Sequence, residues 1–144
     1  MSRAAIYDAL TTDHALSHLG INDDTVFANY SLDEPPLDTG PFLILRWENQ
    51  DSPVFFDPSK NVVPNTRNLT VWAHYPMSLS TDFNKLDAIL DSVDAVLSKM
   101  EQVKGLDGET VTSVRVFGRS SDFKDEAFQT ISRNALYQVL SRKS

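Results

Sequence analysis

The stretch Ser80–Val103, STDFNKLDAILDSVDAVLSKMEQV, has the clearest periodicity of apolar residues in the sequence. It indicates the fold, because the rest of the chain must cover its apolar face. Its apolar residues recur at spacings of three and four, which places them on one face of an α-helix. These residues are Phe83, Leu86, Leu90, Val93, Leu97 and Met100, with Ile89 and Val96 widening the stripe. A stripe of this breadth is typical of a helix that lies on a sheet, because a coiled-coil seam is narrower. The remaining sequence must therefore supply the sheet.

Both ends of this predicted helix carry recognisable signals. Ser80 or Thr81 is placed to cap the N-terminus, where Asp82 would also suit the positive end of the helix dipole. Gly105 lies just beyond the other end, where helices often finish in a left-handed residue. We therefore expect the helix to fill most of the stretch between these signals.

A line of aspartates follows the opposite side of the helix. Asp87, Asp91 and Asp94 are spaced at i, i+4 and i+7, so they share one face. Such carboxylates can hold a hard cation. However, Lys85 and Lys99 lie nearby, and no glycine-bent loop is present to wrap an ion. We therefore expect a solvated acidic face and no metal site.

The composition limits the class of protein. The 144 residues suffice for one domain, residues 1–144, with a core of its own. The absence of cysteine excludes disulfides and thiol nucleophiles, and the net charge of −7 argues against a surface that grips nucleic acid. No apolar run is long enough to cross a bilayer, and the start of the chain lacks the apolar core of a signal peptide. We expect a soluble protein made without a secretion signal.

The N-terminal segment predicts two short helices. In the first, one face carries Ala5, Ile6, Ala9 and Leu10. Asp13 is placed to cap the second, which carries Leu16 and Leu19, and Gly20 is placed to close it in a left-handed conformation.

Five later segments have strand character. They are Thr25–Ser31, Phe42–Glu48, Arg67–Tyr75, Glu109–Phe117 and about Glu126–Leu140. The near-continuous apolar run of Phe42–Glu48 indicates a central strand that is covered on both faces. Pro76 should end the third strand, and the segment GRSSDFKD before the last one reads as a polar loop. The last strand mixes apolar residues of both parities, which predicts a bulge or a second buried face.

The resulting order is α-β-β-β-α-β-β. Because the strands arrive in groups, with helices between the groups, this order favours an α+β fold. We expect a mostly antiparallel or mixed sheet of about five strands with two main helices packed on one face.

The search for catalytic or binding chemistry gives little. His14 and His18 have a metal-ligand spacing but lack the glutamate of the H-E-x-x-H pattern, so two exposed histidines are favoured. His74, at a strand end, is more typical of a buried, hydrogen-bonded histidine than of a catalytic one. No phosphate-binding glycine motif is present. The arginines Arg115, Arg119 and Arg133 are interpreted as scattered and solvated, although a basic stripe across the last two strands remains an alternative.

Two loops are rich in features suited to contacts. Gln50–Thr66 contains three prolines together with the apolar residues Val54, Phe55, Phe56, Val62 and Val63. A loop with so much apolar surface either folds back onto the core or meets a partner. The second loop, DEPPLDTG, is acidic, with Asp33, Glu34 and Asp38.

Several stretches together resemble the tail terminator proteins of long-tailed, siphophage-type bacteriophages. They are SRAAIYDAL (2–10), DTGPFLILRW (38–47), NLTVWAHYP (68–76), TDFNKLDAILDSV (81–93) and ISRNALYQVLSR (131–142). The resemblance covers nearly the whole chain in the same order of elements. It implies a structural virion protein that is made in the host cytoplasm and forms a homo-oligomeric ring, in this family typically a hexamer. The ring would sit on the head-proximal end of the tail tube, stop tube polymerisation and join the tail to the head.

The resemblance also implies which partners and surfaces to expect. The partners would be the tail tube protein and the head-tail connector or stopper protein, with DNA passing through the ring without specific binding and no membrane involved. No active site and no cofactor or metal is expected. We assign tube or subunit contacts to Val54, Phe55, Phe56, Val62 and Val63, and an acidic rim or lumen to Asp33, Glu34 and Asp38. The alternatives are another neck or tail-completion protein, or a small-ligand-binding or hydrolytic α+β domain that uses His74 with an acidic partner.

Overall fold

The computed structural model describes residues 3–28, 40–47, 52–53, 64–106, 108–126 and 129–143. The helices are α1 (Arg3–Thr12), α2 (His14–His18) and α3 (Asn84–Ser98). The strands are β1 (Val26–Ala28), β2 (Phe42–Trp47), β3 (Ser52–Pro53), β4 (Pro64–Pro76), β5 (Val103–Lys104), β6 (Glu109–Arg119), β7 (Phe123–Asp125) and β8 (Thr130–Lys143). In these parts of the chain, none of the helices has the length and apolarity that crossing a bilayer requires.

The strands form one mixed sheet, so the predicted α+β class is confirmed. The order is β1-β2-β4-β8-β6-β5, with β3 pairing with β4 and β7 with β8. Only the pair β1 and β2 is parallel among the described strands; the others are antiparallel. The long strands β4 and β8 pair from Pro64↔Arg142 to Pro76↔Thr130 and form the centre of the sheet. Pro76 ends β4 as predicted.

The prediction that the strand at residues 42–48 is not an edge strand is confirmed, because β2 lies between β1 and β4, near one end of the sheet. Its two faces are covered unequally. Leu43, Leu45 and Trp47 face the core, whereas on the other face Phe42 is buried against the ring of His74, and Arg46 is exposed.

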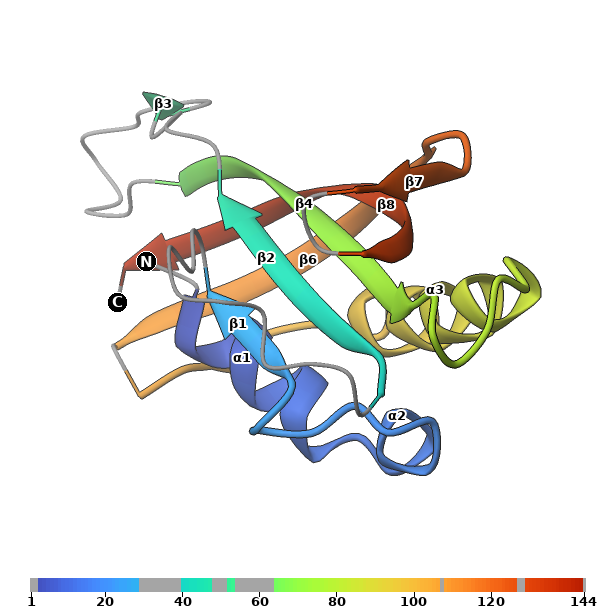
Figure 1. Cartoon of the computed structure of the whole chain (residues 1–144). Coiled ribbons are helices and arrows are strands. Elements are labelled where there is room, and N and C mark those ends of the chain that lie inside the picture. Colours follow the sequence, from blue (N-terminus) through green and yellow to red (C-terminus); the bar gives the residue numbers. More distant parts are fainter. Residues whose placement is uncertain are drawn as a thin grey trace, which may run out of the picture.

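Helices α1 and α3 pack on one face of the sheet (Figure 1). α3 lies against β4, β6 and β8, and α1 contacts α3, β1 and β6. The predicted apolar face of α3 is confirmed, because Leu86, Ile89, Leu90, Val93, Leu97 and Met100 are buried in the core. Phe83 and Val96 pack against that core while remaining partly exposed.

The ends of α3 differ from the prediction. The helix begins at Asn84, and Phe83 at the N-cap makes no side-chain capping bond. Ser80 does not cap the helix, because its hydroxyl accepts from the backbone N–H of Asp82; the Asp82 carboxylate in turn accepts from Asn84 N–H at 3.0 Å. Gly105 does not end the helix either, since it lies in the β5–β6 turn, where its N–H donates to Glu109 O at 2.8 Å.

The N-terminal predictions are confirmed in the described residues. Ile6 and Leu10 of α1 are fully buried. The Asp13 carboxylate accepts from Leu16 N–H at 3.0 Å and so caps α2. Gly20 follows with φ +92°, the left-handed conformation that its position requires.

The prediction of a bulge or a second buried face in the last strand is confirmed as a second buried face. Ile131, Ala135, Tyr137 and Val139 of β8 are buried on one face, and Thr130, Ser132 and Asn134 are buried on the other. The bulges lie in the neighbouring strand β6. The register of β6 against β8 shifts at two points, so that Thr112 and Phe117 are extra residues in β6. The predicted polar loop is also partly a strand: Ser120 N–H donates to Asn134 O at 2.9 Å, and β7 continues the ladder along β8.

Candidate functional site

The residues assigned to contacts from the sequence lie outside the described part of the structure. This holds for Val54, Phe55, Phe56, Val62 and Val63, and for Asp33, Glu34 and Asp38. Their assignments remain predictions. The candidate sites below are built from the described residues.

The aspartates of α3 are paired with arginines of the sheet, which corrects the interpretation of a purely solvated face, although Asp91 remains exposed. Arg119, near the end of β6, donates from Nη2 to Asp91 Oδ1 and to Asp94 Oδ2, both at 2.6 Å. Burial alone would lower the pKa of Arg119, but the hydrogen bonds that its guanidinium donates to Asp94 and Asp91 raise it above the usual value. The guanidinium therefore stays charged between the two carboxylates.

A second pair extends this contact along the helix. Arg133 of β8 forms an ion pair with Asp87, and its Nε donates to Ser120 O at 2.8 Å. Tyr137, also on β8, donates its hydroxyl hydrogen to Asp94. Burial, followed by that hydrogen bond, raises the pKa of Tyr137 well above its usual range. Arg119 and Arg133 are therefore not scattered solvated residues, whereas Arg115 is exposed as predicted. The contacts of Arg119, Arg133 and Tyr137 with α3, which we call the α3 polar clamp, fix the helix on the sheet.

His74 is a structural residue and not an accessible base. It is 3 % exposed on the sheet face opposite the helices, where its ring stacks on Phe42 with centroids 4.8 Å apart. Its Nδ1 lies 2.9 Å from Thr130 Oγ1. Burial lowers the pKa of His74 to about 4, although the charge of Asp125 acts in the opposite direction. The prediction of a buried, hydrogen-bonded histidine is confirmed, and a substrate has little access to the ring.

His14 and His18 face each other on α2. Their Nε2 atoms lie 3.2 Å apart, and both side chains are exposed, as predicted. Two imidazole nitrogens at this separation can meet one transition-metal ion. Across the residues that the structure describes, however, no third histidine or carboxylate joins them to form a metal-binding group. The pair is therefore no more than a partial ligand set.

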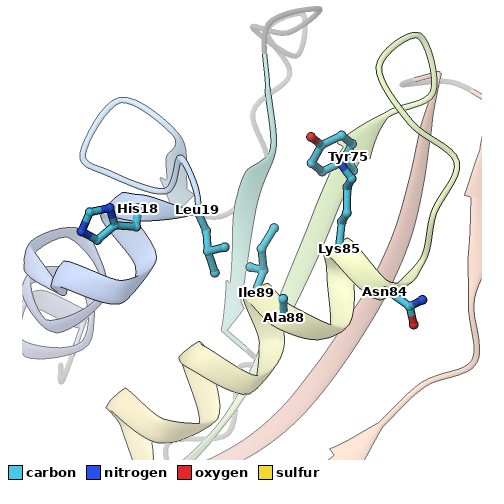
Figure 2. A pocket seen from close by; sticks show the side chains of 7 residues that line it. All are labelled: His18, Leu19, Tyr75, Asn84, Lys85, Ala88 and Ile89. Carbon is cyan, nitrogen blue, oxygen red and sulfur yellow. The ribbon is translucent and has the colours of Figure 1, made fainter.

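An open groove lies between α2 and α3 and has a volume of about 350 Å³ (Figure 2). It is lined by His18, Leu19, Tyr75, Asn84, Lys85, Ala88 and Ile89. Leu19 lies on the α2 side, and Ala88 and Ile89 lie on the α3 side. The Lys85 ammonium lies 5.2 Å from the centre of the Tyr75 ring, so the polar end of the groove holds a cation–π contact. Leu19, Ala88 and Ile89 form the apolar part of the lining, and His18 and Asn84 add further polar groups.

The C-terminal half of β6 exposes apolar side chains at the edge of the sheet. Val116 is 43 % and Phe117 59 % exposed, and the adjacent Arg115 is also exposed. In the described residues, β5 is the strand on the outer side of β6, and it pairs only with Thr110 and Val111. The remainder of this edge is therefore available for contact with another molecule.

Sequence reasoning missed the β6 edge for a physical reason. In the run VRVF (114–117), alternation places Val116 on the same face as Val114, and their partners Tyr137 and Val139 are both in the core, yet Val116 is exposed. Two adjacent apolar residues before a glycine are a sign of a bulge, but the sequence pattern predicts a bulge for the last strand only, as the alternative to a second buried face. The position of the extra residue is set by the pairing with β8, which a single sequence does not show.

No protein-family model matches the chain, and no curated protein matches it. Among solved structures, a chain of the "Virion of native gene transfer agent (GTA) particle" aligns with a TM-score of 0.69. The alignment covers 95 % of this chain and 91 % of that chain, with 13 % sequence identity. At this identity, the similarity establishes a common fold.

Proposed function

We propose that this protein is a structural component of a phage-like virion, and specifically a tail terminator. The observation that carries the proposal is the match of nearly the whole fold, 95 % of the chain, to a chain of a gene transfer agent virion. It agrees with the independent resemblance of the sequence to tail terminators. In this role the chain forms a ring, typically a hexamer, on the last ring of the tail tube, stops polymerisation and presents a surface to the head.

The described surface suits such a subunit. A ring held together by head-to-tail contacts needs two different surfaces on each copy. The apolar edge of β6 and the groove between α2 and α3 are two such surfaces, formed by different elements. The net charge of −7 is also compatible with a channel for DNA, because affinity for DNA comes mainly from cationic contacts with phosphate.

A hydrolytic role is supported less well. It would rest on His74 with Asp125 as the acidic partner, since the charge of Asp125 acts on the His74 ring. The imidazole is 3 % exposed and lies against Phe42 and Thr130, whereas a general base must reach the proton that it abstracts. We therefore assign His74 to the stability of the fold.

The proposal is tested by tube growth. Purified tail tube protein of the same virion is allowed to polymerise with and without this protein, and tube lengths are measured by electron microscopy. A terminator shortens the tubes and stops their further growth. A neck or tail-completion protein leaves the length distribution unchanged, and that result would overturn the terminator assignment.

A further inference from the structure

The two histidines of α2 have the spacing and the separation of two ligands of one metal ion. His14 and His18 are one helical turn apart, the i, i+4 spacing at which a helix presents two imidazoles to the same zinc ion. Their Nε2 atoms lie 3.2 Å apart. Two nitrogens bound to a tetrahedral zinc ion at the usual Zn–N distance lie about 3.3 Å apart. The rings therefore already have the separation that a shared ion requires.

Both imidazoles are available to a ligand from solution. Among the described residues, the hydrogen-bonding contact of each ring is with the other ring. Neither ring takes part in an ion pair in this part of the chain. The ring planes meet at 87°, so the two rings do not cover each other's faces. Because both side chains are exposed, an ion has access to the pair, and water can complete its coordination.

The backbone that carries the pair is held at both ends of α2. The Asp13 carboxylate accepts from Leu16 N–H at 3.0 Å, and Gly20 N–H donates to Ser17 O at 3.1 Å. Leu16, between the two histidines in the sequence, is fully buried and anchors the helix to the core. Since the backbone is already ordered, binding an ion would require little further ordering of the chain.

We propose that His14 and His18 together bind one divalent transition-metal ion, such as Zn²⁺, through their Nε2 atoms. Imidazole suits Zn²⁺, Cu²⁺ and Ni²⁺, whereas Mg²⁺ and Ca²⁺ take oxygen ligands. The described residues supply no third ligand, so water fills the remaining positions and the ion exchanges with the solution. The site is independent of the proposed role in tail assembly.

Calorimetric titration of the untagged full-length protein with Zn²⁺ tests the site. The titration is done at about pH 7.5, where imidazole is mostly neutral and free to bind a metal. We expect saturable binding of one ion per chain. His14→Gln and His18→Gln should each weaken this binding at least about tenfold, because the second nitrogen is no longer held close to the ion. Circular dichroism checks that each variant keeps its fold.

A shifted pair provides the matched control. The double variant His14→Gln/Ser17→His keeps two histidines on α2, at the exposed positions 17 and 18, where the side chains of adjacent residues do not face each other. It should bind Zn²⁺ as weakly as His14→Gln does. Binding as tight as that of the parent protein would show that any two histidines on α2 suffice, and would overturn the shared site.

Hydrogen exchange locates the ion on the chain. Zn²⁺ bound to both rings bridges one turn of α2 and should slow the exchange of the backbone amides in His14–His18 of the parent protein, but not in the single variants. If Zn²⁺ gives no saturable binding up to about 1 mM, the rings are only a hydrogen-bonded pair and the proposal is wrong. Binding that is equally tight in both single variants would also overturn it.

Discussion

Arg119 on β6 forms an ion pair with Asp94 on α3, with 2.6 Å between Nη2 and Oδ2. This ion pair holds the main helix on the sheet in addition to the apolar packing of the core. Asp94 also accepts the Tyr137 hydroxyl hydrogen, so one carboxylate holds two side chains from two strands. The two side chains of the ion pair are mostly buried, at 19 % and 27 % exposed. Loss of the carboxylate would leave the Tyr137 hydroxyl without this acceptor and would leave Arg119 paired with Asp91 alone.

The first prediction concerns this carboxylate. Asp94→Asn should lower the free energy of unfolding by about 1–3 kcal/mol, since hydrogen bonds to a charged group are lost at a partly buried site. Asp91→Asn is the matched control: it contacts the same guanidinium, but its side chain is 71 % exposed, and its loss should cost at most about 1 kcal/mol. Urea unfolding followed by circular dichroism measures both. Equal losses for the two variants would show that the polar clamp does not depend on Asp94.

The second prediction concerns pH. The pKa of His74 is about 4 in the folded protein and about 6.5 in the unfolded chain, so the unfolded state takes up the proton first as the pH falls. The stabilisation is complete above about pH 6.5 and is lost progressively towards pH 4. We expect a loss of about 2 kcal/mol in the free energy of unfolding between pH 7 and pH 5 from this residue.

The measurement compares unfolding at the two pH values in His74→Gln and in the double variant His14→Gln/His18→Gln. The His74 variant should lose most of the pH-dependent difference. The double variant leaves the surroundings of His74 unchanged and should keep the part of the difference that His74 supplies. The same pH dependence in His74→Gln as in the parent protein would refute the assignment.

The third prediction concerns the proline-rich loop. Replacing Phe55 and Phe56 by Ser should give a folded subunit that fails to join tails, if these residues contact the tube or a neighbouring copy. Circular dichroism reports folding, and electron microscopy of tails reports joining. Unfolding of the variant would instead assign the two phenylalanines to the core.

The fourth prediction concerns the acidic loop. Reversing the charges of Asp33, Glu34 and Asp38 to Lys should slow DNA ejection or block the joining of heads, because a cationic rim would hold phosphate. Infectivity or DNA transfer by the assembled particle is the readout. If the reversed variant performs like the parent protein, these carboxylates do not face the DNA path.

Much of the fold follows from periodicity alone. The apolar stripe of α3 and the alternation of Leu69, Val71 and Ala73 in β4 identify the core, because burial on one face leaves a regular pattern. The Asp13 cap and the left-handed Gly20 could also be predicted from the sequence, since each depends only on the residue type and its neighbours along the chain.

The errors come from interactions between distant residues. Nothing near Asp87 or Asp94 in the sequence indicates that Arg133 and Arg119 approach them from strands that follow. For the same reason, the place of the bulge and the continuation of the ladder into β7 required the observed register with β8. The exposure of Val116 and Phe117 at the β6 edge likewise depends on the pairing of distant strands. From the sequence alone, Phe117 cannot be distinguished from the buried apolar residues of a strand.

The central claim is that this chain terminates a tail tube, and electron microscopy of the protein with preformed tail tubes tests it most directly. We predict annular particles that sit on one end of each tube, coaxial with it, and tubes that no longer elongate when tube protein is added. Tubes that keep bare ends and continue to grow in the presence of saturating protein would contradict the claim.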